Sequence, residues 1–444
     1  MNQLQKSGGV ALLPFLVFVL TFLGAGIGLA DFYAFPSPVA VVLGIIVAFL
    51  ILKGSITAKV DALIRGCGDS RIMTMCLIYL LAGAFATVSK AMGGVDATVN
   101  LGLALVPVKF LALGIFLLAG FLSTASGTSV GSIVALGPIA VGLAEQSQTS
   151  MPLMLGALLG GAMFGDNLSF ISDTTIAATQ SQECSMKDKF KVNILIAGPA
   201  ALLNIFLLFL AGQYAVAPEG LLPEAAAFSF WPIVPYLLVI VLAVTGVNVF
   251  VVLSIGTLLA GLIGFIDGSL QPLLFAQKVY EGFTGMTEIF LLSMLTGGLA
   301  EMVRAAGGID YLVSGISKAI GSHKTAQVGI GALVSGTNAA IANNTVSIVV
   351  TGPVVKEISR NYAVDKRKTA ALMDIFSCVI QGLLPYGAQV LIIIGFTKNS
   401  VSFTQLLAHA WYLYLLFGFT LLAIFTPIVD KYLARLPAAE TPAG

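Results

Sequence analysis

The sequence predicts an all-α polytopic membrane protein with two inverted-topology repeats, whose broken or re-entrant helices meet at the membrane midplane. This prediction rests on the composition, on a repeated segment and on the distribution of lysine and arginine. Of the 444 residues, 58% are hydrophobic and 10% are charged, and the mean hydropathy is +0.99. Since a soluble globular domain carries about 25% charged residues, this composition excludes one. The net charge of +1 gives no indication of a nucleic-acid partner.

Apolar segments recur along the whole chain, and many are long enough to cross a hydrocarbon core of about 30 Å. We expect about 10 to 13 transmembrane segments, some of them incomplete. They lie near 10–30, 38–52, 72–88, 94–124, 129–145, 150–166, 191–213, 227–246, 248–267, 285–304, 324–340, 345–356, 369–396 and 402–427. The lipid bilayer is therefore an expected partner, and a cell membrane, in particular a cell inner membrane, is the expected location.

A repeated segment indicates that the chain contains two related halves. LAGAFATVSKAMGGVD at 81–96 and LTGGLAEMVRAAGGID at 295–310 align without a gap, and both end in a Gly-Gly pair followed by an aspartate. Similarity at a fixed spacing along one chain is the signature of a structural repeat.

A second pair of segments follows each copy at a similar distance. SGTS at 126–129 leads to Gly137-Pro138, and we align it with SGTN at 335–338, which leads to Gly352-Pro353. The predicted organisation is an N-terminal transmembrane helix at 1–33, repeat 1 at 34–215, a connecting loop and linker helix at 216–244, repeat 2 at 245–430 and a cytoplasmic tail at 431–444.

Lysine and arginine are distributed unequally between corresponding loops. They gather at 53–71, 187–191, 356–368 and 431–435, whereas the repeat partners of the first three segments, 273–285, 397–400 and 142–152, have almost none. Because short loops rich in Lys and Arg stay in the cytoplasm, corresponding loops are expected on opposite sides of the membrane. This pattern is typical of the inverted-topology repeats of secondary transporters. It also predicts that both termini are cytoplasmic.

One stretch is strongly polar although it lies in an apolar part of the chain: MFGDNLSFISDTTIAATQSQ at 163–182. Its partner in repeat 2, LMDIFSCVIQGLLPYGAQ at 372–389, is also interrupted by polar residues and a proline. Irregular backbone at membrane depth is tolerated only where it lines a cavity or is buried in protein. We therefore expect helix breaks, and the substrate site, where the two stretches meet. The residues expected to permit the breaks are Gly127, Gly165, Gly336 and Pro385.

Asp166 and Asp173 are the carboxylates of the first polar stretch. A carboxylate within the membrane is unfavourable unless it is paired, and it needs a cation or a proton. Carboxylates, the Asn167 amide, hydroxyls and freed backbone carbonyls are oxygen ligands that suit Na⁺. We therefore expect Asp166, Asn167 and Asp173 to bind Na⁺, with a proton competing for the same group. Such competition is sufficient for exchange, with Na⁺ and H⁺ as coupling ions and no other cofactor.

The wider set of candidate ion- or substrate-binding residues comprises polar or flexible positions of both stretches and of the SGTS, SGTN and ANNT segments. It consists of Asp166, Asn167, Ser169, Ser172, Asp173, Thr174, Thr175, Ser126, Gly127, Thr128, Ser335, Gly336, Thr337, Asn338, Asn343, Asn344, Asp374 and Gln381. Two structural alternatives remain open. Asp173 can act as the N-cap of a helix, and SGTS and SGTN can be small-residue packing faces.

Other ionisable residues are expected to have simpler roles. Glu288 and Glu301 either carry protons or lie at the membrane interface beside Arg304. Asp96 and Asp310, each next to a Gly-Gly pair, are typical of turns and caps. The four cysteines are expected to be unpaired, and the two histidines to be a loop residue and an interfacial residue.

The segment GDNLSFISDTT at 165–175 resembles the signature of the NhaC-type Na⁺/H⁺ antiporters, which is close to G-D-K-x-S-P-L-S-D-T-T. These proteins belong to the ion transporter superfamily of secondary carriers. The match keeps Gly165, Asp166, Ser169, Ser172, Asp173, Thr174 and Thr175. With the SGTS and SGTN segments and the chain length, the resemblance covers most of the sequence. It implies a fold of two inverted units and an activity of Na⁺-linked exchange or transport.

Two departures from the family signature matter. Asn167 stands where the family usually has lysine, and Phe170 where it usually has proline. The change at Asn167 replaces a fixed positive charge with a neutral carbonyl ligand. It can alter the proton stoichiometry, or mark a branch that moves an organic solute with Na⁺.

The main functional hypothesis is therefore Na⁺/H⁺ antiport, with Asp166 and Asp173 binding Na⁺ and H⁺ alternately. The alternative is Na⁺- or H⁺-coupled transport or exchange of a small amino acid or organic acid, held by the SGTS, SGTN and ANNT segments. An enzyme is not expected, because the sequence has no HExxH segment and no nucleophile and base pair within the membrane. A homodimer is a further expectation.

Overall fold

The computed structural model describes residues 4–28, 35–170, 172–214, 230–245, 247–398 and 400–435. The regular elements of these residues are all helical, which confirms the predicted fold class. The α-helices are α1 (Leu13–Gly28), α2 (Ser37–Ile51), α3 (Ile56–Cys67), α4 (Ser70–Ala91), α5 (Gly94–Leu105), α6 (Leu111–Ser126), α7 (Ser129–Ser147), α8 (Met151–Leu168), α9 (Asp173–Gln182), α10 (Met186–Tyr214), α11 (Val234–Val244), α12 (Val249–Asp267), α13 (Pro272–Gly285), α14 (Thr287–Ala305), α15 (Gly308–Ser317), α16 (His323–Ile341), α17 (Asn344–Asn361), α18 (Lys366–Leu383), α19 (Ala388–Phe396), α20 (Phe403–Ala408), α21 (Trp411–Phe425) and α22 (Ile428–Leu433).

Several of these helices are long and apolar enough to span a membrane. In the described part of the chain these are Ile72–Ala91, Val108–Ser126, Ser129–Ser147, Met151–Gln182, Met186–Gln213, Val249–Asp267 and Lys366–Phe396. Helices α13 and α14 are long and apolar enough only when taken together, and the chain bends by 43° between them. Shorter apolar helices cover the predicted segments at 10–30, 38–52, 227–246 and 402–427, whereas the segments at 324–340 and 345–356 form α16 and α17, which are not among these apolar helices. The chain is therefore a multi-pass membrane protein.

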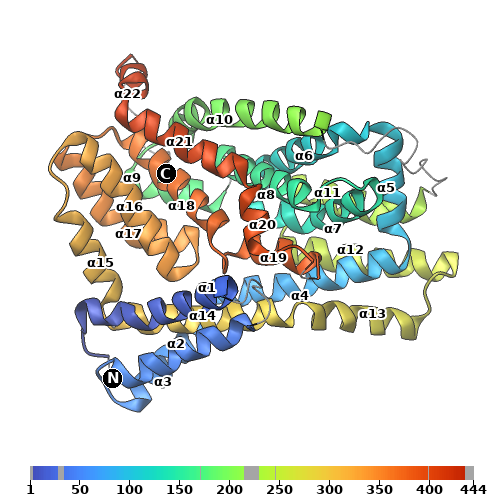
Figure 1. The fold of residues 1–444 in the computed structure, drawn as a ribbon, viewed down its shortest axis with the longest axis horizontal. Coiled ribbons are helices and arrows are strands. Elements are labelled where there is room, and N and C mark those ends of the chain that lie inside the picture. The colour runs from blue at the N-terminus through green and yellow to red at the C-terminus, as the bar shows by residue number, and fades with distance from the viewer. Residues whose placement is uncertain are drawn as a thin grey trace.

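The helices form two layers, as Figure 1 shows. The first layer contains α1–α4 and α12–α15, and the second contains α6–α10 and α16–α21. Glycines allow close contact within the first layer: a Cβ at Gly66 of α3 would collide with the Gly297 carbonyl oxygen of α14, and one at Gly83 of α4 would collide with the Gly282 carbonyl oxygen of α13. Small residues at helix interfaces are typical of membrane proteins.

The backbone itself repeats. Five pairs of residues with positive φ are each separated by 214 or 215 positions: Gly54 and Gly268, Gly93 and Gly307, Gly127 and Ala342, Gln148 and Ala363, and Glu183 and Lys398. Because a positive φ marks a sharp change of chain direction, the same turns recur in both halves. The domain boundaries stay a prediction, and those at 33–34 and 215–216 lie outside the described residues.

This spacing corrects the predicted alignment of SGTS with SGTN. The structural equivalent of Gly127, which ends α6, is Ala342, which ends α16. SGTN at 335–338 lies inside α16 instead. The alignment by identical letters was wrong because an asparagine cap, Asn343, replaces the threonine cap Thr128 at the start of the next helix.

The equivalent helices of the two halves run in opposite directions. Helices α7, α9, α17 and α19 all begin at one central cavity. The ends of α9 and α17 then meet at one surface, around Glu183 and Arg360, whereas the ends of α7 and α19 meet elsewhere, around Glu145 and Lys398. Since α7 corresponds to α17 and α9 to α19, this divergence is that of inverted repeats.

Two of the four predicted break residues are correct. Gly127 adopts a left-handed conformation between α6 and α7, and Pro385 lies in the break between α18 and α19. Gly165 and Gly336 were wrong, because both lie inside helices, α8 and α16. Gly165 instead permits close packing, since a Cβ there would collide with the Gly120 carbonyl oxygen of α6.

The predicted basic loops also need correction. The segments 53–71 and 273–285 largely form helices, α3 and α13. Lys59, Lys189 and Lys368 are buried; Lys59 donates a hydrogen bond to the Phe49 carbonyl oxygen, and the other two form ion pairs. A lysine near a helix terminus can thus turn inward, a choice that counting charges along the sequence does not detect.

The other ionisable residues make polar contacts, and a proton-carrying role of Glu288 and Glu301 stays a prediction. Glu301 pairs with Arg304 at 2.6 Å, as one of the two alternatives predicted, whereas the exposed Glu288 accepts a hydrogen bond from Ser37. Asp96 and Asp310 lie in the first turns of α5 and α15. The four cysteines are unpaired. His323, predicted to lie in a loop, is the first residue of α16, where its ring nitrogen lies 2.9 Å from the Tyr362 carbonyl oxygen, and the ring nitrogen of His409 lies 2.8 Å from the Gln405 carbonyl oxygen.

Candidate functional site

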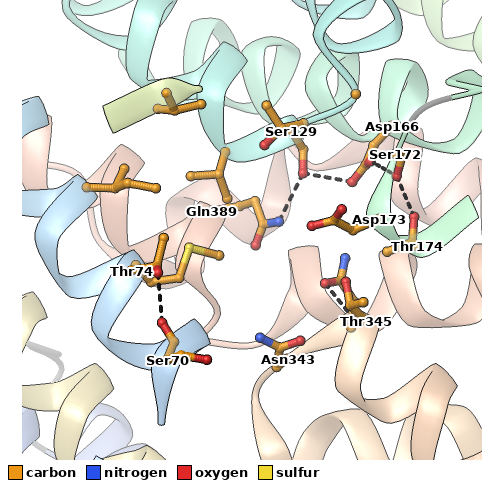
Figure 2. A pocket seen from close by; sticks show the side chains of 17 residues that line it. Ser70, Thr74, Ser129, Asp166, Ser172, Asp173, Thr174, Asn343, Thr345 and Gln389 are labelled. Carbon is orange, nitrogen blue, oxygen red and sulfur yellow. Dashed lines mark hydrogen bonds between the residues drawn. The ribbon is translucent and has the colours of Figure 1, made fainter. Parts of the chain in front are cut away.

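A cavity of about 290 Å³ lies between the two layers, at the breaks of the helices; we call it the central cavity. Figure 2 shows the side chains that line it. They belong to α4 and α12 on one side and to the broken helices of both repeats on the other. The lining residues are Ser70, Thr74, Met75, Ile78, Gly127, Thr128, Ser129, Val130, Asp166, Ser172, Asp173, Thr174, Val249, Asn343, Asn344, Thr345 and Gln389.

Four helices present their N-termini to the central cavity: α7, α9, α17 and α19. The Thr128 side chain caps α7 by accepting a hydrogen bond from the Gly131 amide, and the Asn343 side chain caps α17 in the same way from Val346. Helix N-termini carry partial positive charge and unsatisfied amides, so they favour anionic groups. The cavity is thus suited to carboxylates, whether these belong to the protein or to a solute.

Asp166 lies in the last turn of α8 and is only 4% exposed. Ser172 donates a hydrogen bond to one carboxylate oxygen at 2.6 Å, and Ser129 donates one to the other at 2.9 Å. Figure 2 shows this carboxylate held between the two hydroxyls at the cavity wall. The C-terminal end of a helix carries partial negative charge, so this position favours a bound cation.

Asp173 is the first residue of α9, and its N-cap is Ser172. The alternative that Asp173 itself caps the helix is therefore wrong. Its side chain is exposed and lines the cavity between Gln389 and Thr174 (Figure 2). A carboxylate in the first turn is stabilised by the helix dipole, and this one is open to whatever enters the cavity.

Gln389 connects the second repeat to the Asp166 carboxylate through Ser129. Its side-chain amide donates a hydrogen bond to Ser129 at 3.0 Å, and Ser129 in turn donates to Asp166. Among the residues that the structure describes, the buried amide oxygen of Gln389 has no hydrogen-bond partner. An unpaired oxygen beside a buried carboxylate is a suitable additional ligand for Na⁺.

Four predicted site residues lie outside the central cavity, near Lys189 of α10. Lys189 forms an ion pair with Asp374 at 2.7 Å and donates hydrogen bonds to the Asn167 carbonyl oxygen and to Thr175. Thr175 donates to the Ser169 carbonyl oxygen. Asn167, Ser169, Thr175 and Asp374 therefore hold the broken helix from behind, and they do not line the cavity.

The other predicted residues are divided between the cavity and its surroundings. Asp166, Ser172, Asp173, Thr174, Gly127, Thr128, Asn343 and Asn344 line the cavity. Ser335, Gly336, Thr337 and Asn338 lie in α16, where Asn338 donates a hydrogen bond to a carbonyl oxygen of α18, a placement that favours the packing interpretation. Ser126 is at the end of α6, and Gln381 lines a small neighbouring pocket of about 30 Å³.

Sequence reasoning missed three residues near Asp166: Ser129, Gln389 and Lys189. Ser129 and Gln389 lie at the starts of α7 and α19. A correct alignment of the two repeats would have shown this and marked both residues as candidates. Lys189 carried a misleading signal, because its lysine-rich neighbourhood is typical of a cytoplasmic loop. Its burial follows from Asp374, which is distant in sequence and needs a partner.

Comparison with known proteins gives a consistent family. The sequence model described as the Na⁺/H⁺ antiporter family matches residues 6–213 and 218–425. The chain is 22% identical over 387 residues to a malate-2H⁺/Na⁺-lactate antiporter of Bacillus subtilis, which covers 81% of this chain and 82% of that protein.

Two further relatives carry other antiporter names. The chain is 23% identical to the Na⁺/H⁺ antiporter NhaC of Bacillus subtilis, over 72% of this chain and 76% of that protein. It is 25% identical to the arginine/ornithine antiporter ArcD of Halobacterium salinarum, over 86% of this chain and 85% of that protein. The relatives thus share antiport and differ in what they exchange.

Proposed function

We propose that this chain, which belongs to the Na⁺/H⁺ antiporter family, exchanges Na⁺ for H⁺ across the membrane with Asp166 and Asp173 as the ion-binding carboxylates. Na⁺ and a proton bind alternately to Asp166, while Asp173 attracts cations from the water in the cavity. The repeats move around this site to expose it to either side.

The observation that carries this proposal is the environment of Asp166. Its carboxylate is buried in the membrane region, is held by two serine hydroxyls, and lies at the wall of a cavity. Hydroxyls alone do not neutralise a buried charge, so the carboxylate requires a cation or a proton. The Gln389 amide oxygen and the Ser129 hydroxyl oxygen provide further ligands within the same hydrogen-bonded group.

Three finer features belong to the same proposal. Both termini lie in the cytoplasm, and Figure 1 shows both described ends in the left half of the view. The basic residues that support this orientation are those that remain exposed, such as Arg360. The repeats extend over 34–215 and 245–430, and the protein forms a homodimer.

A second candidate function is coupled transport of a small amino acid or organic acid. The observation that favours it is the size and polarity of the central cavity: about 290 Å³ exceeds the roughly 30 Å³ that one water occupies. The N-termini of α7 and α17 are available for a solute carboxylate. Two relatives named for malate and lactate, and for arginine and ornithine, support this candidate.

A proteoliposome assay tests the two candidates against each other. Purified protein is reconstituted with a pH-sensitive dye inside the vesicles, and Na⁺ is added without any solute. We expect proton efflux on Na⁺ addition, and we expect Asp166→Asn to abolish it. The matched control is Asp267→Asn, an exposed aspartate at the end of α12, which leaves the rate unchanged.

The same vesicles are then tested with labelled malate, lactate, arginine and ornithine. Proton movement without solute supports Na⁺/H⁺ exchange. Strict dependence of both Na⁺ and proton movement on one of these solutes supports the second candidate and rejects the first. Full activity of Asp166→Asn in every condition rejects the assignment of the site.

A further inference from the structure

A cluster of buried polar side chains lies behind the first broken helix, which consists of α8 and α9; we call it the Lys189 cluster. It comprises Lys189 and Asn193 of α10, Asn167 of α8, Thr175 of α9 and Asp374 of α18. None of these side chains lines the central cavity. The side chain of Lys189 is 1% exposed and that of Asp374 is 0% exposed. An ion pair so fully removed from water is rare within membrane-spanning segments and marks a functional position.

The Lys189 ammonium is surrounded by oxygen atoms of three kinds. They are the Asp374 carboxylate at 2.7 Å, the Asn167 carbonyl at 3.3 Å and the Thr175 hydroxyl at 2.5 Å. A carboxylate, a backbone carbonyl freed at a helix end and a hydroxyl are the ligand types that bind Na⁺ in broken-helix transporters. The ammonium therefore occupies the position of a metal cation.

The cluster also contains oxygen ligands that Lys189 does not use. Among the described residues, the side-chain oxygen of Asn193 is buried without a hydrogen-bond partner. Asn193 uses its amide nitrogen on the Asn167 carbonyl at 2.6 Å and on Asp374 at 3.0 Å, which leaves its oxygen free. The second Asp374 oxygen has, within the same part of the chain, only the Cys378 thiol at 4.0 Å. Buried polar atoms are rarely left unpaired in a purely structural network.

The cluster is electrically connected to the proposed Na⁺ site. Asp166 and Asn167 are neighbours in α8: Asp166 lines the central cavity, and the Asn167 backbone carbonyl accepts a hydrogen bond from Lys189. Asp374 and Lys189 both interact with Asp166 by Coulomb forces. With Asp173, the region contains three carboxylates and one ammonium, which leaves two negative charges for mobile cations.

We propose that Lys189 is a tethered cation that permanently fills a second cation site, made by Asp374, Asn167 and Thr175, and so limits the number of Na⁺ ions that the protein binds. This inference rests on the proposed binding of Na⁺ at Asp166. Lys189 acts as a positioning residue: it neutralises Asp374 and joins the end of α8 to the start of α9, so that only the Asp166 side of the break exchanges ions.

Counting bound ²²Na⁺ by equilibrium dialysis of the purified full-length protein tests this proposal. Lys189→Ala leaves the Asp374 carboxylate without a partner and leaves space for an ion, because alanine lacks the long side chain. We expect this variant to bind one more Na⁺ per chain than the unchanged protein. Added NaCl, compared with choline chloride, also raises its melting temperature more than that of the unchanged protein, because the ion replaces the missing charge.

Two matched variants control the count. Lys189→Arg keeps the positive charge and is expected to bind the original number of Na⁺ ions. Lys189→Ala combined with Asp374→Asn removes both charges and is also expected to return to the original number. An extra Na⁺ that appears in the double variant contradicts the proposal, because Asp374 is then not its ligand.

Asp374→Asn alone keeps the test decisive if Lys189→Ala does not fold. It leaves the Lys189 charge uncompensated near Asp166, so the dissociation constant for Na⁺ is expected to rise at least tenfold. The same number of bound ions in Lys189→Ala, or an unchanged dissociation constant in Asp374→Asn, overturns the proposal. Failure of the proposed function is distinguishable, because Asp166→Asn then binds as many ions as the unchanged protein.

Discussion

The first broken helix, α8 and α9, and the second, α18 and α19, have equivalent backbones and different side chains. Both pairs begin, break and resume at positions 215 residues apart. This spacing makes Gln381 the equivalent of Asp166 and Gln389 the equivalent of Thr174. The carboxylates that line the central cavity therefore belong to one repeat, and the other repeat contributes amides.

This difference indicates how a duplicated backbone can serve an asymmetric reaction. The breaks are needed twice, because each broken helix exposes an N-terminus to the cavity from its own side of the membrane. The charges are needed once, because two facing sets of carboxylates would repel each other and raise the cost of burial. Gln389 supplies the contact that a second carboxylate could not, by donating a hydrogen bond to Ser129.

The largest expected difference between the two broken helices is in transport activity. Asp166→Asn removes the ion-binding charge from the first broken helix, and we expect a loss of Na⁺-driven proton flux of at least about 100-fold, as for the loss of a buried charge interaction of about 3 kcal/mol or more. Gln381→Leu changes the equivalent position of the second broken helix, and we expect a loss of less than about tenfold, because only one neutral hydrogen bond, to Ala342, is removed.

Initial rates in proteoliposomes measure this difference. The amount of inserted protein is determined for each variant, so that poor folding is not counted as lost transport. Equal losses in Asp166→Asn and Gln381→Leu would contradict the asymmetry of the two repeats.

The sequence was sufficient for the fold class and for the position of Asp166. Composition and apolar segments indicated the membrane helices, and the polar stretch at 163–182 indicated the break. Both signals are local, because a carboxylate in an apolar stretch is costly wherever the chain folds. The placement of Asp166 beside Ser172 also follows from a short separation along the chain.

The contacts between distant segments were not predictable. The Lys189 and Asp374 pair joins α10 to α18, and the Gln389 and Ser129 contact joins the two repeats. A lysine in a basic segment is usually exposed, and only the fold shows that a buried carboxylate lies within its reach. The break at Ala342 lies in the gap between the predicted segments 324–340 and 345–356, but Gly336 was predicted as the break residue, because an alanine with positive φ gives no sequence signal.

Packing beside the two broken helices offers a second comparison, because a large and a small residue exchange places. In repeat 1, Gly161 of α8 lies against Phe116 of α6, whereas in repeat 2 the equivalent Phe376 of α18 lies against Gly331 of α16. A Cβ at Gly161 would collide with the Phe116 backbone carbonyl, which cannot move. A Cβ at Gly331 would approach the Phe376 ring at 2.5 Å, and a ring can rotate or shift.

We therefore expect Gly161→Ala to destabilise the protein by about 1–3 kcal/mol. Gly331→Ala is expected to cost less than about 1 kcal/mol, because the higher helix propensity of alanine offsets part of the strain. Melting temperatures in detergent measure both effects. Similar shifts for the two variants would show that the backbone contact at Gly161 is no more rigid than the ring contact at Gly331.

The turns at Gly127 and Ala342 provide a smaller test at equivalent positions. Both residues have positive φ, which glycine adopts freely and alanine does not. Gly127→Ala is expected to lower stability by about 1–2 kcal/mol, and Ala342→Gly to raise it by up to about 1 kcal/mol, because the strain of the left-handed conformation is introduced or removed. The melting temperatures of the two variants should shift in opposite directions, and shifts of the same sign would reject this equivalence.

The smallest expected effect concerns the far ends of α9 and α19. Glu183 pairs with Lys356 at 2.6 Å and with Arg360 at 3.7 Å. At the equivalent positions the charges are reversed: Lys398 replaces Glu183 and Glu145 replaces Arg360, and both line a cavity of about 850 Å³. Within the described residues neither Lys398 nor Glu145 forms an ion pair. Ion pairs therefore connect the helix ends at the Glu183 surface, and none connects them at the Lys398 surface.

The hydrogen bond from Lys356 holds the pKa of the exposed Glu183 carboxyl below its usual value. A lowered pKa stabilises the folded protein above the pKa of the unfolded chain, about 4.3, and this contribution is lost as the pH falls through the lowered pKa. Glu183→Gln is therefore expected to lower the melting temperature slightly at pH 7, and this effect is expected to diminish as the pH falls below about 4.3. Lys398→Gln, at the equivalent position without an ion pair, is expected to leave the melting temperature unchanged at pH 7. An equal decrease of the melting temperature in both variants at pH 7 would show that Lys398 also forms a stabilising ion pair, and that the two surfaces do not differ.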